Sequence, residues 1–224
     1  NNPELFSKFL ELYKKGKFEI INPTYSQPYN LIIGQESNIK HFELGIKFLS
    51  QFKIIPKIYY CSESSLHPQI PQLLKKFGIQ YGSLKTRLLG AAPTAIAPKI
   101  LWIGRDNTSI DSIASLSGLF DGEYWHGSFY NELPNLLFQA EAKPFMEKIV
   151  YSSIEDFVVE QPLMEDVWRI SRFSNLIGSF NLYSQILDNL TREGEYKYRR
   201  DDFLLGNSIF IPSNLFLQNK ISEI

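Results

Sequence analysis

The feature that most constrains this fold is the alternation of helix-type and strand-type patterns through the first half of the chain. Apolar residues recur at helical spacing after Asn2-Pro3, an N-cap followed by a first-turn proline, and again over residues 36–52 and 68–77. Short apolar runs typical of strands separate these stretches, at residues 18–21, 54–61, 79–84 and 99–103. Parallel strands need crossover connections, which the intervening helices supply. We therefore predict an α/β fold in which residues 18–22, 57–61 and 79–83 lie parallel in one sheet.

The second half of the chain has a different pattern. Residues 163–190 carry apolar positions at helical spacing and no proline, which predicts a long helix with a break at Gly178. No internal repeat or low-complexity segment is present. We therefore divide the chain into an α/β segment, residues 1–160, and a mainly helical segment, residues 161–224.

Composition excludes several classes of protein. With 224 residues, of which 44% are hydrophobic, the chain can bury one substantial core. Its 23 basic and 24 acidic residues leave the chain nearly neutral, so the sequence shows no electrostatic footprint for nucleic acid. No apolar run approaches the ~20 residues of a membrane span, so we expect no membrane association. Cys61 is the single cysteine, which excludes an internal disulfide and a cysteine-based zinc cluster and fits a cytoplasmic location. The oligomeric state is left open.

Four blocks follow one another in the first half. Residues 15–28 place Glu19 on a short strand that leads into a threonine–tyrosine loop, and residues 34–49 begin a helix that contains Gly45. Residues 56–79 comprise a strand, a short connection and a helix that begins near Pro68. Residues 101–110 have the pattern of a hairpin in which Asn107 occupies the turn.

These collinear blocks resemble the catalytic domain of glycoside hydrolase family 38, the α-mannosidase type. The resemblance implies a partial (β/α)7 barrel of the glycosidase and deacetylase type, followed by a mainly helical segment. It also implies that the chain is a fragment of an enzyme that hydrolyses α-mannosides or related glycosides with retention. In that chemistry two carboxyl groups flank the anomeric carbon about 5–5.5 Å apart, one as nucleophile and one as acid/base.

The nucleophile position departs from the family pattern. Where family 38 has its aspartate this chain has Ser62, which cannot form a glycosyl-enzyme intermediate in the same way, and the neighbouring carboxylate is Glu63. The related family 57 enzymes use a glutamate at a comparable strand end, five residues before a proline, as Glu63 stands before Pro68. Two interpretations stay open: Glu63 is the catalytic nucleophile, or it is an exposed or helix-capping residue on the rim of the barrel.

Asp201 and Asp202 are the candidates for the acid/base, because they follow the long helical stretch in a context similar to that of the family's second aspartate. Their flanking arginines also fit plain surface ion pairs, which contribute little to stability.

The resemblance further implies a zinc ion, held by a His-x-Asp pair on the first strand of the barrel and by a later histidine. None of the three histidines, His41, His67 and His126, stands in such a pair. We therefore expect no zinc ligands in this segment, and we expect the first strand to lie upstream of Asn1 or to be absent.

The candidates for carbohydrate binding are His67, Trp102, Asp106 and Trp125. Tryptophan rings pack on the C–H faces of sugars, although a strand tryptophan such as Trp102 is more often part of a core. Trp125 lies in a polar and aromatic stretch, residues 123–128, that is typical of a rim loop. A rival hypothesis is a degenerate homologue that binds carbohydrate or a protein partner without hydrolysis, and a third is an α/β domain with no role in glycan chemistry. Ser62, and the Tyr29-Asn30 pair where the family has an acidic loop residue, favour the degenerate homologue.

Overall fold

The structure is a computed structural model. It describes residues 2–28, 30, 33–60, 67–84, 94–95, 99–113, 115–116, 141, 169, 171–173 and 179–197.

Within these ranges, the first helix begins and ends where local sequence signals predict. The first helix, α1 (Pro3–Lys14), starts at Asn2, whose side chain accepts a hydrogen bond from the Leu5 N–H at 3.1 Å. Gly16 follows that helix with φ +65°, a conformation that glycine adopts without strain. The other helices are α2 (Gln35–Ser50), α3 (Ile70–Lys76), a 3-10 turn η1 (Ser171–Phe173) and α7 (Tyr183–Asn189).

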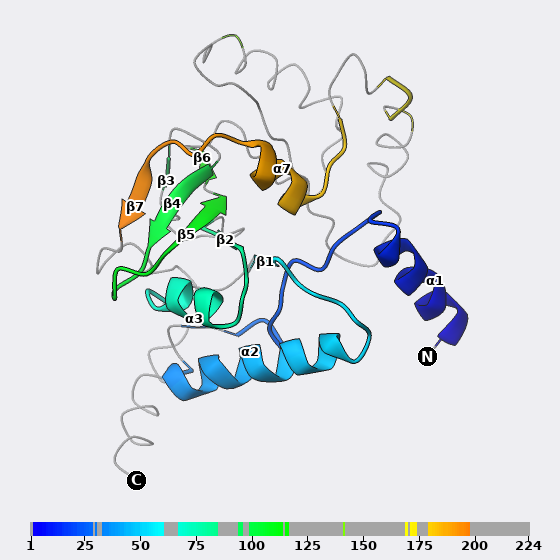
Figure 1. Ribbon diagram of the computed structural model, residues 1–224, viewed down its shortest axis with the longest axis horizontal. Helices are drawn as coiled ribbons and strands as arrows, with labels where there is room; N and C mark the ends of the chain where they lie inside the picture. Colours follow the sequence, from blue (N-terminus) through cyan, green and yellow to red (C-terminus); the bar gives the residue numbers. More distant parts are fainter. Residues whose placement is uncertain are drawn as a thin grey trace, which may run out of the picture.

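Five short strands form one mixed sheet with the order β1-β2-β5-β4-β7 (Figure 1). The strands β1, β2 and β5 are parallel to one another, β4 is antiparallel to β5, and β7 is parallel to β4. Their bounds are β1 Ile58–Tyr59, β2 Tyr81–Ser83, β4 Lys99–Ile103, β5 Ser109–Ile113 and β7 Glu195–Lys197. A separate parallel pair joins β3 (Thr94–Ala95) to β6 (Ser115–Leu116).

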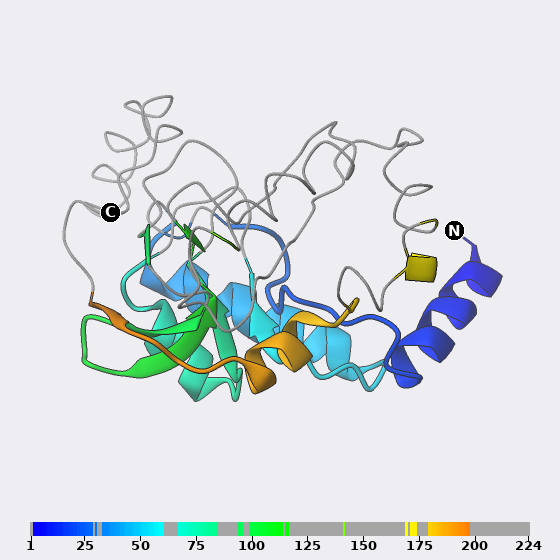
Figure 2. The same ribbon diagram turned by 90° about the horizontal axis from the view of Figure 1, so that it is seen from above.

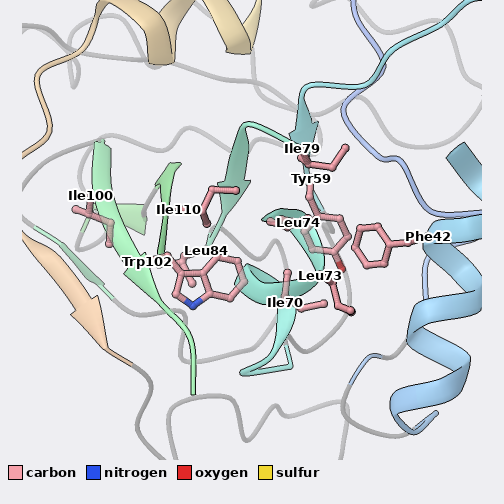
Figure 3. Close-up of a cluster of buried hydrophobic side chains, with 10 residues drawn as sticks. All are labelled: Phe42, Tyr59, Ile70, Leu73, Leu74, Ile79, Leu84, Ile100, Trp102 and Ile110. Carbon is pink, nitrogen blue, oxygen red and sulfur yellow. The ribbon is translucent and has the colours of Figure 1, made fainter. Parts of the chain in front are cut away.

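The sheet has a different partner on each face. On one face lie α2 and α3, and the core there contains Phe42, Tyr59, Leu74 and Trp102 (Figure 3). On the other face lies α7, whose Leu187 is fully buried in a smaller cluster with Ile58 and Ile113. The helix α1 lies at the opposite end of the molecule from the β4–β5 hairpin (Figures 1 and 2).

A buried network of hydrogen bonds joins β1 to α2 and to the loop before α2. The Tyr59 hydroxyl donates to Asn30 Oδ1 at 2.7 Å, and the Asn30 amide donates to Asn38 Oδ1 at 2.7 Å. The Asn38 amide in turn donates to the Asn30 carbonyl at 2.8 Å. Because these buried polar groups bond one another, the loop is fixed to the core without an unpaired amide among them.

Several sequence-based predictions are confirmed. The architecture is α/β, β1 and β2 are parallel, and β4 spans residues 99–103 as predicted. The described residues do not confirm the (β/α)7 barrel, because they form a mixed sheet in which β4 and β5 are antiparallel.

Two other predictions are wrong in part. Residues 18–22 are not a strand: they make a single ladder-type bond, from the Tyr60 N–H to the Ile21 carbonyl at 2.7 Å. The reason is local, since Pro23 has no N–H and the Asn22 side chain takes the Thr24 N–H at 3.0 Å. The predicted long helix over residues 163–190 is also interrupted, because residues 179–182 are not helical before α7 begins at Tyr183.

The predicted division at residue 160 stays a prediction. Within the described residues, β7 pairs with β4 and α7 packs on β5, so this part of the second segment shares the sheet of the first.

Candidate functional site

The candidate nucleophile Glu63 follows the carboxyl end of β1. It lies outside the described residues, as does Ser62, and the chain is described up to Tyr60, three residues before it. In the sheet register Tyr59 is in one row with Gly82, Ser112 and Ile100. The strands β1, β2 and β5 therefore end together, and we call this side of the sheet the Tyr60 edge. In parallel sheets the carboxyl ends of strands are the usual location for active-site groups.

Tyr60 is itself buried, and its ring contacts that of Tyr183, the first residue of α7, with centroids 6.2 Å apart. Next to Tyr183, the Ser184 N–H donates to Glu19 Oε1 at 2.8 Å. The first turn of α7 thus lies against the strand end that leads to Glu63. Glu19, a residue of the first sequence block, acts as an acceptor at the N-terminus of that helix.

His67 lies immediately before α3 and is half-buried. Its Nδ1 accepts the Gln69 N–H at 3.2 Å, so that nitrogen is unprotonated. Burial, and then the positive charge of Arg105, lower the pKa of His67 below its usual value of 6.5. At neutral pH the ring is therefore uncharged, and it orders the turn that begins α3.

Asp106 lies in the turn between β4 and β5. Its Oδ1 accepts the Thr108 N–H at 3.0 Å, and its Oδ2 accepts the Thr108 hydroxyl at 2.7 Å. Asn107 has φ +65°, which asparagine tolerates better than most residues. The adjacent Arg105 N–H donates to the Pro68 carbonyl at 3.1 Å, so this turn packs against the start of α3. The structure thus brings the surroundings of His67 and Asp106 together, with both carboxylate oxygens of Asp106 engaged inside the turn.

Trp102 does not lie in a cleft. Its side chain is fully buried between β4 and α3, and its indole N–H has no hydrogen-bond partner among the described residues (Figure 3). A ring with no exposed surface cannot stack on a sugar from solvent, so this position does not support the predicted role in carbohydrate binding. Trp125 lies outside the described residues.

Asp201 and Asp202 also lie outside the described residues, but the strand that precedes them is described. That strand, β7, is antiparallel to β1, so it ends at Lys197, beside Ile103 and on the side of the sheet opposite the Tyr60 edge. Four strand spacings separate β1 from β7. At about 4.8 Å per spacing and about 3.3 Å per residue, Tyr59 and Lys197 are roughly 20 Å apart. Glu63 and the two aspartates can approach to the retaining separation only if both connecting segments turn toward each other across the sheet.

A second group of polar side chains, which sequence reasoning missed, lies between α7 and the sheet. The Lys99 ammonium is buried and donates to the Leu187 carbonyl at 2.6 Å, with Asp111 Oδ2 3.5 Å away. The other oxygen of Asp111 accepts from Arg192 at 3.0 Å. The sequence contained one signal for this group, the alternation in β5, which places Asp111 on the face opposite Ile110. The partners of Asp111 could not be predicted in this way, because Arg192 lies about eighty residues further along the chain.

Tyr81 belongs to the same group. Its hydroxyl donates to Asp188 on α7, and burial together with this bond to a carboxylate raises the pKa of Tyr81 to about 12. Tyr81 therefore stays protonated across the physiological range and acts as a donor.

The described residues do not fit a zinc site. No group of three or more histidine, cysteine, aspartate and glutamate side chains gathers among them in a way that could bind a metal ion. His41 contacts Ser26 Oγ at 3.2 Å through Nδ1, and His67 uses Nδ1 within its own turn. In this part of the chain, no step of the chemistry can be derived through zinc.

A family model and several solved structures are similar to this chain. Residues 1–86 match the family model of glycosyl hydrolase family 57. A crystal structure of 4-alpha-glucanotransferase from Thermococcus litoralis superimposes with a TM-score of 0.56 at 16% identity, over 87% of this chain and 30% of that one. Residues 1–86 are therefore similar to a family of glycoside hydrolases, and the fold resembles that of the glucanotransferase. An alpha-mannosidase from Enterococcus faecalis V583 is similar with a TM-score of 0.57 at 17% identity, over 87% of this chain and 23% of that one.

A third structure, a family 38 protein from Enterococcus faecalis, gives a TM-score of 0.52 at 15% identity, over 88% of this chain and 22% of that one. Comparison with curated proteins gave no match. The chain thus spans less than a third of the length of each of these structures. Family 38 is not specifically confirmed, because the family model that matches is that of family 57.

No helix in the described ranges is both long and apolar enough to cross a lipid bilayer.

Proposed function

We propose that this chain is part of the catalytic domain of a retaining glycoside hydrolase in which Glu63 is the nucleophile. The observation that carries the proposal is the match of residues 1–86 to family 57, taken with the position of Glu63 four residues after Tyr59, the last residue of the parallel strand β1. A glutamate at that point can reach a substrate at the carboxyl edge of the sheet, where connecting loops vary without disturbing the core. Glu63 stands one residue after the position of the family 38 aspartate, and this is the position expected for a glutamate of the family 57 type.

The proposed reaction follows the retaining scheme. The Glu63 carboxylate attacks the anomeric carbon, the glycosidic bond breaks, and the acid/base donates a proton to the departing oxygen. Water then attacks the glycosyl-enzyme ester, with the acid/base accepting its proton, and Glu63 is released as a carboxylate. Asp201 and Asp202 are the proposed acid/base candidates. We take α-linked hexosides as the substrate class, α-mannosides first, because the similar structures are named as an alpha-mannosidase and a 4-alpha-glucanotransferase. Zinc belongs to the proposal through the family 38 resemblance alone.

The decisive experiment uses the full-length parent protein with activated aryl α-mannoside and aryl α-glucoside substrates. We expect Glu63→Gln to abolish hydrolysis, because an amide cannot form the ester intermediate, while Ser62→Ala retains it. A 2-fluoro glycosyl fluoride should label the wild type, and peptide mapping should locate the added mass on Glu63. Asp201→Asn and Asp202→Asn are compared by the pH dependence of hydrolysis. The aspartate whose replacement removes the pH optimum of the activity is assigned as the acid/base.

Labelling elsewhere, or full activity in Glu63→Gln, would refute the assignment of the nucleophile. If the wild type hydrolyses neither substrate, the second candidate function applies: a degenerate homologue that binds carbohydrate or a protein partner. Ser62 in the family 38 nucleophile position favours it, and retention on a mannan or amylose affinity gel would test its carbohydrate arm.

A further inference from the structure

The contacts between α7 and the sheet differ in kind from those that hold the opposite face together. On the α2 and α3 side, ten buried hydrophobic residues form one cluster. On the α7 side the buried hydrophobic cluster has three members, and Leu187 is the one that α7 contributes. Tyr183 also packs on this smaller cluster, so a limited apolar contact and a set of polar contacts together hold α7 on the sheet.

Asp111 is the centre of these polar contacts. It projects from β5, and its two carboxylate oxygens face Arg192 Nη1 at 3.0 Å and Lys99 Nζ at 3.5 Å. Arg192 belongs to the turn between α7 and β7, whereas Lys99 belongs to the sheet and also donates to the Leu187 carbonyl. One carboxylate thus connects the sheet to the segment that crosses it.

Placing α7 on the sheet has an unfavourable term, the burial of the Lys99 ammonium group. Lys99 is only 8% exposed, so placing α7 over it removes an ammonium group from water. Desolvation of a charge offsets much of what its ion pairs and hydrogen bonds contribute. A helix with a purely apolar face would pack on the sheet without this desolvation cost. The polar contacts of Lys99 therefore stabilise the closed arrangement of α7 less than their number would indicate.

We propose that residues 183–192, which we call the strap, detach from the sheet while β7 and the α2 and α3 side stay in place, and that Asp111 holds the strap through Arg192. Detachment uncovers Tyr60 and Tyr81 on the face of the sheet beside the Tyr60 edge. The strand β7 stays paired with β4, where Tyr196 packs against the larger cluster. The strap therefore controls access to that face. The proposal concerns the fold and stands whether or not Glu63 is a nucleophile.

The test is hydrogen–deuterium exchange of the 224-residue chain, followed by mass spectrometry of peptides. In the wild type, amides of the strap should exchange faster than those of β2 and β5, because opening requires only local separation. Asp111→Asn keeps the shape of the side chain and removes both ion pairs, so strap exchange should accelerate about tenfold or more. Exchange in α3 and β2 should stay unchanged. Sodium chloride at about 0.5 M should accelerate strap exchange in the wild type and not in the variant, because it screens pairs that the variant lacks.

Glu43→Gln is the matched control, since it removes an exposed ion pair with Lys40 on α2 by the same carboxylate-to-amide change. It should leave strap exchange unaltered. The proposal is overturned if the strap and β5 exchange together in the wild type, or if Asp111→Asn leaves strap exchange unchanged or accelerates exchange equally throughout the sheet.

Discussion

Replacing Gly45 with alanine tests how closely α2 approaches the loop that precedes it. Gly45 is buried in the middle of α2. A methyl group built there would lie 2.2 Å from the Pro23 carbonyl oxygen, 2.5 Å from the Thr24 carbonyl carbon and 2.6 Å from the Tyr25 nitrogen. All three are backbone atoms, so no side-chain rotation relieves the contact. The helix and the loop have to separate by about an ångström before the contacts become ordinary.

The expected loss of stability follows from three terms. Overpacking against rigid neighbours costs about 3 kcal/mol, at the upper end of the usual range. Separation also strains the hydrogen bond from the Tyr25 N–H to the His41 carbonyl, 2.9 Å long, which contributes about 1 kcal/mol. Alanine in place of glycine favours the helix by about 1 kcal/mol. We therefore expect the free energy of unfolding to fall by about 3 kcal/mol, with Tm lower by roughly 6–12 °C for a chain of this size.

Urea denaturation followed by circular dichroism measures this change as a lower midpoint at constant slope. Lys47→Ala, two residues further along α2 and exposed, is the control and should alter stability by no more than about 0.5 kcal/mol. If Gly45→Ala were as stable as the wild type or more so, helix propensity would be the dominant effect and the close approach of the loop would be refuted.

Two further predictions concern His67 and Tyr59. Because the folded state holds the pKa of His67 below 6.5, the unfolded chain binds a proton first, and stability should fall as the pH drops below about 6.5. In His67→Asn the amide oxygen can accept the Gln69 N–H without titrating. The urea midpoints measured at about pH 8 and about pH 5.5 should therefore differ less in this variant than in the wild type. An unchanged difference between the two midpoints would contradict the shifted pKa. Tyr59→Phe removes the donor to Asn30 Oδ1 and leaves a buried acceptor unpaired, so it should lower the free energy of unfolding by about 1–3 kcal/mol. A midpoint equal to that of the wild type would show that the network contributes nothing.

The sequence alone determined those parts of the fold that local interactions control. The N-cap at Asn2 and the left-handed glycine at Gly16 define α1, and both depend on atoms within a few residues. A short apolar run identified β4 at Lys99–Ile103, with its bounds. The apolar run at residues 54–61 likewise predicted the strand after which the family resemblance placed Glu63. Helix caps and strand periodicity need no distant partner, and for that reason they can be recognised in a single sequence.

The tertiary structure decided what depends on distant partners. Trp102 alternates with apolar neighbours on both sides, so its direction followed only from the packing of α3 and Tyr196 on one face of β4. The same is true of β7, whose residue Glu195 pairs with Leu101 across more than ninety positions of the chain. That pairing carries the chain before Asp201 to the side of the sheet away from Tyr60, and it brings Arg192 to Asp111. Strand order, strand direction and the ion pairs between segments depend on which surfaces remain to be buried once the local elements have formed. Periodicity and caps, which are local signals, contain no information about that choice.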